Sequence, residues 1–208
     1  MNIELFKKIK NADFSKIFSI LGYKYFTNGE YNINIIGIRA NMNNRLTNRY
    51  DDIMVVEYKE NSKLIRKIWS ITTDPGNKYM NKPSNSKGTA ILVPGQYYGT
   101  YKLDLHNGKY LALCQRNGPV KVYRDNNKNN EYDYDVSSIE EGLFGINIHR
   151  SNEYYTRSTI DGYSAGCQVF NNPMDFKEFI NIVKKSASIY GNKFTYTLIT
   201  EDDLWIGK

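Results

Sequence analysis

Two side chains of the sequence could together perform nucleophilic chemistry: Cys167 and His149, eighteen positions apart. A free thiol has a pKa of about 8.5, so at neutral pH it needs a nearby base to become a nucleophilic thiolate. Histidine can supply that base because its imidazole gains and loses a proton near pH 7. The chain has only two cysteines and two histidines, and one of each falls in a glycine-flanked segment. The pair therefore predicts a cysteine nucleophile.

The residues around Cys167 are typical of a turn that binds an oxyanion. The three residues before it, 164–166, are small. Small side chains let backbone N–H groups approach a bound carbonyl, and one such donor lowers a barrier by roughly 3 kcal/mol. A third group must orient the imidazole, for which Asp161 and Ser164 are candidates. The alternative is that Cys167 is an unreactive core thiol and His149 a strand histidine with a satisfied ring.

The elements that would position this pair are mostly strands. From residue 31 to 123, β-branched and aromatic runs are bounded by turn formers. The segment His106-Asn107-Gly108 between two such runs is a strong hairpin signal. Residues 46–52 and 77–88 are polar and predict loops. We predict strands at 33–38, 53–58, 64–72, 89–93, 99–105, 109–115, 120–123 and 194–199, and a short strand at 145–149 that ends at the histidine.

Helices are expected at two places. Apolar residues recur at roughly helical spacing from 3 to 21, with a break at 11–13 and a stop at Gly22. Asn172-Pro173 starts a second, amphipathic helix directly after the cysteine segment. The sequence thus predicts a mainly β, β-rich α+β fold, with a helical arm at residues 1–30 and a catalytic domain at residues 31–208.

Composition excludes several function classes. The net charge is +6, but the 28 Lys and Arg residues are scattered, so we expect no nucleic-acid partner. No apolar run reaches the length of a membrane span, and the first eight residues do not resemble a secretory signal. Two cysteines form no disulfide framework, and Cys114, in an apolar run, is expected to be buried and inert.

Residues 125–133 resemble half of a calcium loop, because oxygen-bearing side chains alternate there. Asn130 stands where an EF-hand has glycine, and Val136 where it has a bidentate glutamate. A solvated loop and a cation site both remain open, and we predict no metal site.

The residues of the pair resemble the catalytic domain of the L,D-transpeptidases, the YkuD-type domain. That family carries a histidine on a strand, a variable loop, and Ser-His-Gly-Cys followed after one residue by arginine. His149 matches the histidine, and Ser164, Gly166 and Cys167 match the serine, the glycine and the nucleophile. The resemblance covers roughly residues 31–200. It implies a β-sandwich or barrel with one helix after the catalytic segment.

The resemblance also implies a mechanism without a cofactor. His149 takes the proton of Cys167, and the thiolate attacks the amide between an L- and a D-centre of a peptidoglycan stem peptide. Backbone N–H groups near Gly166 and Cys167 stabilise the oxyanion, and His149 protonates the leaving amine to give a thioester. Water then completes a hydrolysis, or a wall amine completes a cross-link. In the family, a backbone carbonyl commonly orients the imidazole.

Three departures from the family pattern concern the substrate. Arg150 replaces a glycine, Ala165 replaces a second histidine, and Val169 stands where the family has its arginine. That arginine helps to hold a substrate carboxylate or to orient the site. We therefore assign substrate binding to other residues around the pair: Arg150, Arg157, Gln168 and Tyr163.

The leading hypothesis is a wall-active, L,D-transpeptidase-like cysteine enzyme, with hydrolysis favoured over cross-linking. Without a secretory signal, a phage origin would bring it to peptidoglycan, either as a virion-associated protein or from the host cytoplasm by release to the cell wall. Its arm at residues 1–30 could then bind other virion proteins. A non-catalytic virion structural or wall-binding protein of the same fold is the main alternative, and a cytoplasmic thiol enzyme acting on another acyl substrate is a third.

Overall fold

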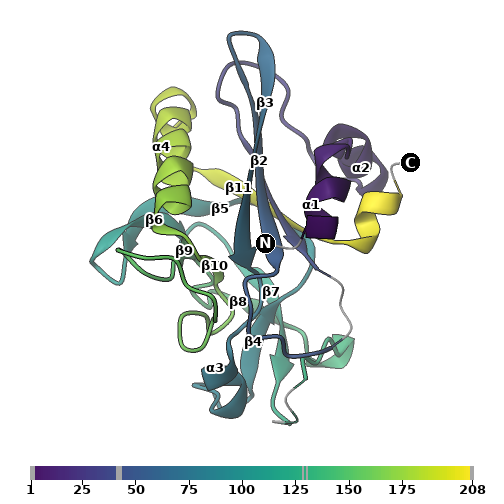
Figure 1. Cartoon of the computed structure of the whole chain (residues 1–208), viewed down its shortest axis with the longest axis vertical. Helices are drawn as coiled ribbons and strands as arrows, with labels where there is room; N and C mark the ends of the chain where they lie inside the picture. Colours follow the sequence, from purple (N-terminus) through teal and green to yellow (C-terminus); the bar gives the residue numbers. More distant parts are fainter. Residues whose placement is uncertain (1–2, 41–43, 128, 130, 207–208) are drawn as a thin grey trace.

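The computed structural model describes residues 3–40, 44–127, 129 and 131–206. Its main feature is a closed barrel of strands in the order β1-β11-β5-β6-β9-β10-β3-β2, beside a smaller sheet, β4-β7-β8 (Figure 1). The predicted mainly β fold is confirmed. The strands are β1 (Asn34–Arg39), β2 (Asp52–Glu60), β3 (Lys63–Thr72), β4 (Thr89–Leu92), β5 (Gly95–His106), β6 (Tyr110–Gln115), β7 (Val120–Asp125), β8 (Glu140–Gly142), β9 (Ile148–Arg150), β10 (Gln168–Phe170) and β11 (Phe194–Thr200).

Neighbouring strands of the barrel are antiparallel except in two pairs. The β2–β3 ladder runs from Asp52 opposite Ile71 to Glu60 opposite Lys63, and this hairpin projects at the top of Figure 1. The parallel pairs are β1 with β11 and β9 with β10. Parallel neighbours cannot be joined by a tight turn and need a crossover connection. The β9–β10 pair matters most, because it carries the two residues that the sequence singled out.

Most of the predicted strands are confirmed, but the sequence analysis did not predict β8 or β10, and two predicted segments differ in detail. The hairpin at Asn107-Gly108 joins β5 to β6, with φ angles of 51° and 70° at its two turn residues. The expected loop at 77–88 begins with a short helix, α3 (Asn77–Asn81). The expected strand at 145–149 is only Ile148–Arg150, because Gly145 has a left-handed φ of 72° that a strand cannot continue.

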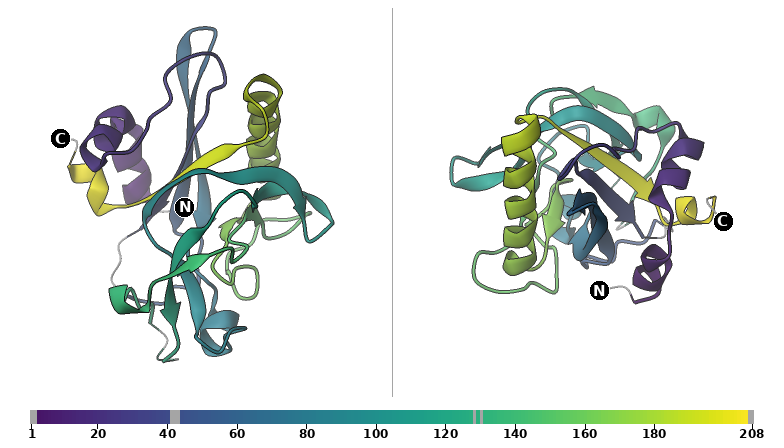
Figure 2. Two further views of the ribbon diagram at one scale, coloured as in Figure 1. Left: turned by 180° about the vertical axis from the view of Figure 1, so that it is seen from behind. Right: turned by 90° about the horizontal axis from the view of Figure 1, so that it is seen from above.

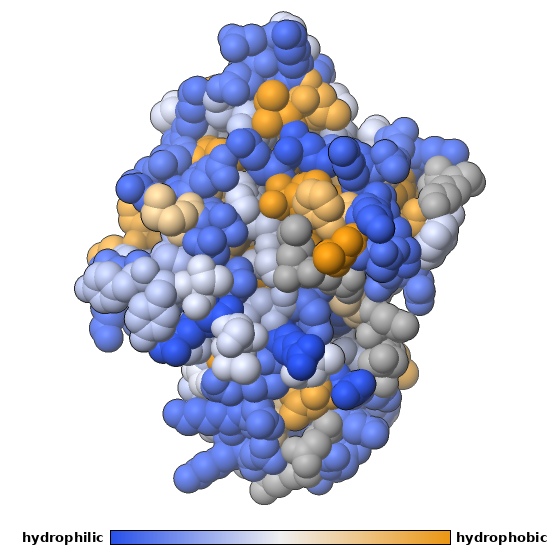
Figure 3. Space-filling model, viewed as in Figure 1, coloured by the Kyte–Doolittle hydropathy of each residue, from blue (hydrophilic) through white to orange (hydrophobic). Residues whose placement is uncertain are grey.

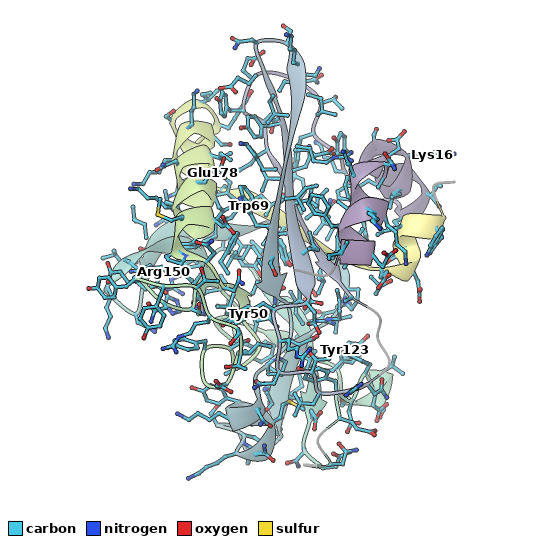
Figure 4. The ribbon with its side chains drawn as sticks, in the orientation of Figure 1. Lys16, Tyr50, Trp69, Tyr123, Arg150 and Glu178 are labelled. Carbon is cyan, nitrogen blue, oxygen red and sulfur yellow. The ribbon has the colours of Figure 1, made fainter. Side chains whose placement is uncertain are left out.

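The long helix α4 (Pro173–Tyr190) covers one side of the barrel. Asn172 caps it by accepting a hydrogen bond from the Met174 N–H, as predicted for a helix that begins at Pro173. Its apolar face packs into the main core, where the Phe179 ring lies 5.0 Å from that of Phe170. Figure 4 shows Glu178 facing Trp69, whose indole N–H donates to the carboxylate over 3.1 Å. The helix thereby fixes β10, the strand after the cysteine.

Two short helices, α1 (Ile3–Lys10) and α2 (Phe14–Leu21), lie on the other side of the barrel. Asp13 caps α2, and Gly22 ends it with a φ of 72°. Their apolar side chains form a second core with β1, β2 and β11. The C-terminal 3-10 helix η2 (Asp202–Trp205) packs beside them, joined by a 2.6 Å ion pair between Lys8 and Glu201 (Figure 2). The two helices of the predicted arm are thus packed on the body, with most of their apolar side chains buried and with Ile3 and Ile20 exposed.

A buried polar network ties the ends of β1, β2 and β3 together. Arg39 has no exposed surface, and its guanidinium donates to the Thr73 hydroxyl and carbonyl and to the Leu92 carbonyl. Asp74 lies 2.9 Å from the same guanidinium, and Asp52 accepts from the N–H and hydroxyl of Thr73. Because Leu92 belongs to β4, this network also joins the small sheet to the barrel.

The face of the molecule in Figure 3 is mostly hydrophilic, with apolar side chains in several separate patches. No helix within the described residues has the length and apolar character needed to cross a bilayer.

Candidate active site

The candidate site lies on the parallel pair β9–β10. Val169 is the register partner of His149, and Gln168 is the partner of Ile148. Cys167 immediately precedes β10, so it lies two positions from the partner of His149. Residues 151–167 form the crossover that returns the chain to the neighbouring strand. The topology therefore brings the thiol and the imidazole to adjacent strands.

The turn before β10, Ser164–Cys167, is hereafter the cysteine turn. The buried Ser164 hydroxyl donates to the Cys167 carbonyl over 2.8 Å and accepts from the Gly166 N–H over 3.1 Å. Gly166 has a φ of 118°, and a Cβ there would lie 2.3 Å from the Ala90 carbonyl oxygen. Both residues were predicted to be catalytic, but their contacts show that they hold the shape of the turn.

Only one of the two predicted oxyanion donors is free. The Gly166 N–H is already bonded to Ser164, which corrects the prediction that it faces a substrate carbonyl. The Cys167 N–H has no acceptor within the described part of the chain. Of these two amides, only that of Cys167 is therefore free to donate a hydrogen bond to a substrate oxygen.

Cys167 is partly exposed as a residue, and its thiol is bonded to backbone. Its Sγ accepts from the Asn147 N–H over 3.4 Å and donates to the Gly145 carbonyl over 3.5 Å. Burial raises the pKa of this thiol to about 11, although the hydrogen bond from Asn147 favours the thiolate. The thiol is therefore protonated at neutral pH in the resting protein.

His149 is held in the tautomer that a general base requires. Its Nδ1 lies 2.9 Å from the Arg150 carbonyl oxygen, which can only accept, so Nδ1 carries the proton. Its Nε2 has no hydrogen-bond partner within residues that the structure describes and keeps a lone pair. Burial, and then the nearby His106, lower the pKa of His149 to about 3. The orienting group is thus a backbone carbonyl.

The two side chains proposed to orient the imidazole form hydrogen bonds with other groups. Asp161 accepts from Asn48 over 2.8 Å and from the Thr159 hydroxyl over 2.7 Å. Ser164 belongs to the cysteine turn. No hydrogen bond joins Cys167 to His149 in the described chain, so the resting site contains a neutral thiol and a neutral imidazole that are not bonded to each other.

Two residues of this site were missed by the sequence analysis. The His106 ring stacks on His149 with centroids 4.2 Å apart and planes 17° from parallel. The Asn147 side chain contacts His106 Nδ1 over 3.2 Å. His106 was considered only as part of a hairpin turn. The sequence feature that could have pointed to His106 as a site residue is its rarity, since it is the only other histidine of the chain.

Arg150 lies at the edge of the site. Its guanidinium stacks 4.2 Å above the Tyr110 ring, and it lies 3.5 Å from the Glu153 carboxylate. Figure 4 shows Arg150 at the side of the barrel below α4. A cavity of about 330 Å³ opens there, lined by Lys109, Tyr110, Arg150, Ser151, Asn152, Glu153 and Tyr154.

Arg157 and Tyr163 belong to the crossover. Arg157 donates to the Tyr163 hydroxyl over 2.6 Å and to the Tyr155 hydroxyl over 3.1 Å, and it stacks on both rings. A cavity of about 590 Å³ beside it is lined by Arg49, Tyr50, Asp51, Thr156, Arg157, Ser158 and Asn171. Neither this cavity nor that of Arg150 is lined by Cys167.

Gln168 was predicted to bind substrate, and its position argues against this role. It has no exposed surface. Its amide donates to the Gly166 carbonyl over 3.2 Å and accepts from the Tyr196 hydroxyl over 2.8 Å. Because the amide nitrogen and the amide oxygen are both hydrogen-bonded inside the barrel, the Gln168 side chain stabilises the cysteine turn from the barrel interior.

Within the described residues, no group of three or more His, Cys, Asp or Glu side chains could hold a metal ion. In the half calcium motif, Asp125 accepts from the Asp133 N–H over 3.1 Å and Asn127 accepts from the Asn129 N–H over 3.0 Å. Positions 128 and 130 of this loop lie outside the described residues. Cys114 has no exposed surface, as predicted.

Comparison of the chain with protein-family models, with curated proteins and with solved structures finds no match in any of the three.

Proposed function

We propose that the chain is a cysteine-dependent acyl-transfer enzyme that acts on peptidoglycan stem peptides through a thioester. The observation that carries this proposal is the state of His149: Nδ1 donates to the Arg150 carbonyl and Nε2 keeps a free lone pair, on the strand beside the cysteine turn. The stem peptide as substrate rests on the resemblance of the His149 and Cys167 segments to the L,D-transpeptidases.

The proposed reaction starts from a neutral pair. With the pKa of Cys167 raised to about 11 and that of His149 lowered to about 3, transfer of the proton alone is unfavourable. The proton therefore passes from Sγ to Nε2 only as the C–S bond forms, with the Cys167 N–H donating to the developing oxyanion. The imidazolium then protonates the leaving amine, and a thioester remains on Cys167.

The thioester needs an acceptor. Attack by water releases the acyl group as a carboxylate and completes a hydrolysis, whereas attack by a wall amine forms a cross-link. We propose hydrolysis as the main outcome, in keeping with a protein that opens the wall. The 330 Å³ cavity is lined by the cations Arg150 and Lys109 and by Glu153, which lies 3.5 Å from Arg150, and we propose that the two cations receive a substrate carboxylate there.

A second candidate function is a non-catalytic structural or wall-binding protein. Two observations favour it: no hydrogen bond joins the thiol to the imidazole in the described chain, and the Gly166 N–H is already satisfied. On this alternative, Cys167 is an ordinary thiol whose two contacts with backbone close the turn.

Mass spectrometry of purified muropeptides after incubation with the protein separates the two functions. We expect wild type and Cys114→Ala to change the muropeptides and Cys167→Ala to leave them unchanged. Cys114→Ala is the matched control because it removes the other, fully buried thiol. Activity of Cys167→Ala at the wild-type rate would refute the enzyme. Binding to intact sacculi without any product from wild type would support the alternative.

A further inference from the structure

We propose that His106 is a positioning residue for His149, and that it holds the His149 imidazole flat, neutral and with Nε2 free. The effect of His106 on catalysis rests on the proposed function. The stacking of the two rings does not rest on it, so the stacking can be tested separately.

The hairpin between β5 and β6 delivers His106 to the site. His106 is the last residue of β5 and the register partner of Tyr110, the first residue of β6. Its ring lies 4.2 Å from that of His149 and 17° from parallel, while the Tyr110 ring is tilted 50° to it at 5.5 Å. A parallel ring at this distance covers one face of the His149 imidazole and prevents it from tilting.

Asn147 fixes the orientation of His106. The Asn147 Oδ1 accepts from the Gln115 N–H over 2.9 Å, so its NH₂ group is the end that faces His106. That group donates to Nδ1 of His106 over 3.2 Å. On the other side of the ring, the Asn107 side-chain nitrogen lies 3.1 Å from Nε2, so asparagine side chains contact both ring nitrogens of His106. Asn147 also donates its own backbone N–H to the Cys167 sulfur, which joins His106 to the nucleophile through one residue.

The stack explains why His149 remains neutral. The covering ring removes water from His149, and a proton on His106 would repel a second one at this distance. Burial is the larger cause of the lowered pKa of His149, and the charge of His106 is the second. His106 is itself held neutral, because burial and then Arg116 lower its pKa. Two further titratable or charged groups lie at this cluster: the Tyr110 hydroxyl is 3.5 Å from Nδ1 of His149, and the Arg150 guanidinium stacks on the Tyr110 ring.

NMR titration of the imidazole C–H signals tests the stack directly. In His106→Ala and His106→Phe the only imidazole left is that of His149, so the signal needs no assignment. Between pH 8 and pH 4.5 we expect the wild-type His149 signal not to titrate. In His106→Ala the pKa of His149 should rise into this window, by about two pH units or more toward its ordinary value of about 6.5, because water reaches the ring.

His106→Phe is the matched variant, since it keeps a stacked ring but removes the nitrogens that could take up a proton. It should leave the pKa of His149 well below that in His106→Ala. Equal titration of His149 in wild type and His106→Ala would overturn the proposal, and so would equal titration in His106→Phe and His106→Ala. Unchanged protection of the buried Cys114 thiol from alkylation establishes that each variant is folded.

Muropeptide turnover gives the second readout. In wild type, kcat/KM should show no loss on the acid side down to pH 5, whereas His106→Ala should lose activity as the pH falls through the raised pKa of His149. A uniform loss of activity at every pH, with no new acid limb, would show only a structural role and overturn the positioning role. If wild type has no turnover at all, the proposed function fails while the NMR titration still tests the stack.

Discussion

Cys167 should react as an unactivated thiol in the free protein, and its alkylation rate should reveal this. Its pKa of about 11 reflects burial, and no hydrogen bond from His149 within the described chain opposes that effect. The experiment measures the rate of alkylation by iodoacetamide at pH values from 6 to 9.5. Peptide mapping by mass spectrometry measures Cys167 and Cys114 separately in the wild-type chain.

The expected rate follows from two opposing effects. With a pKa of about 11, roughly 0.03% of Cys167 is thiolate at pH 7.5, against roughly 10% of a free thiol of pKa about 8.5. That is a deficit of about three hundredfold. A more basic thiolate is also more nucleophilic, with a Brønsted slope of about 0.4 to 0.5, which recovers about tenfold. Cys167 should therefore react about thirtyfold more slowly than a free thiol.

The shape of the pH profile is the sharper measurement. The rate should rise about tenfold per pH unit up to pH 9.5 without a plateau, because the thiolate fraction does so below the pKa. His149→Gln should not change it, since His149 is neutral and not bonded to the sulfur. Cys114, with no exposed surface, should remain unlabelled and reports any opening of the fold. A plateau between pH 6 and pH 8 would refute the neutral resting pair.

Three substitutions test the supports of the site by urea unfolding. Ser164→Ala removes two hydrogen bonds of the cysteine turn and should lower the free energy of unfolding by about 1–3 kcal/mol. Gly166→Ala places a Cβ at a φ of 118° and should also lower the free energy of unfolding by about 1–3 kcal/mol. Gly95→Ala is the control and should be nearly neutral, because its Cβ meets only ordinary contacts. Equal losses of stability in the two variants would contradict the strain at Gly166. Arg39→Met leaves Asp74 buried without its cation and should cost about 3–5 kcal/mol, and a loss below about 1 kcal/mol would contradict this account of the network.

The elements with strong local signals could be predicted from the sequence. Gly22 ends α2, Asn172 caps α4, and Asn107-Gly108 turns the β5–β6 hairpin. Each depends on a few adjacent residues, whose dihedral preferences and side-chain hydrogen bonds act without tertiary context. Apolar and β-branched runs likewise located the strands, because burial of one or both faces imposes that pattern.

The contacts between distant elements could not be predicted. His106 reaches His149 only because β6 lies between β5 and β9 in the barrel, and strand order is not encoded in any local pattern. Gln168 looked like a substrate ligand because it is polar and follows the thiol. The structure places it inside the barrel, where the Tyr196 hydroxyl and the Gly166 carbonyl satisfy it. A polar residue is acceptable in a core when both its donor and its acceptor are bonded.

The separation of His149 and Cys167 is itself a consequence of topology. Side-by-side parallel strands need a crossover of a dozen or more residues, and residues 151–167 are that crossover. An eighteen-residue spacing therefore indicates a parallel pair before it indicates catalysis. What favours catalysis is the imidazole: a histidine that only fills a core bonds both nitrogens, whereas His149 commits Nδ1 to a carbonyl and leaves Nε2 without a partner in the described chain. A base in this state can accept the proton of a neighbouring thiol as soon as a substrate carbonyl is attacked.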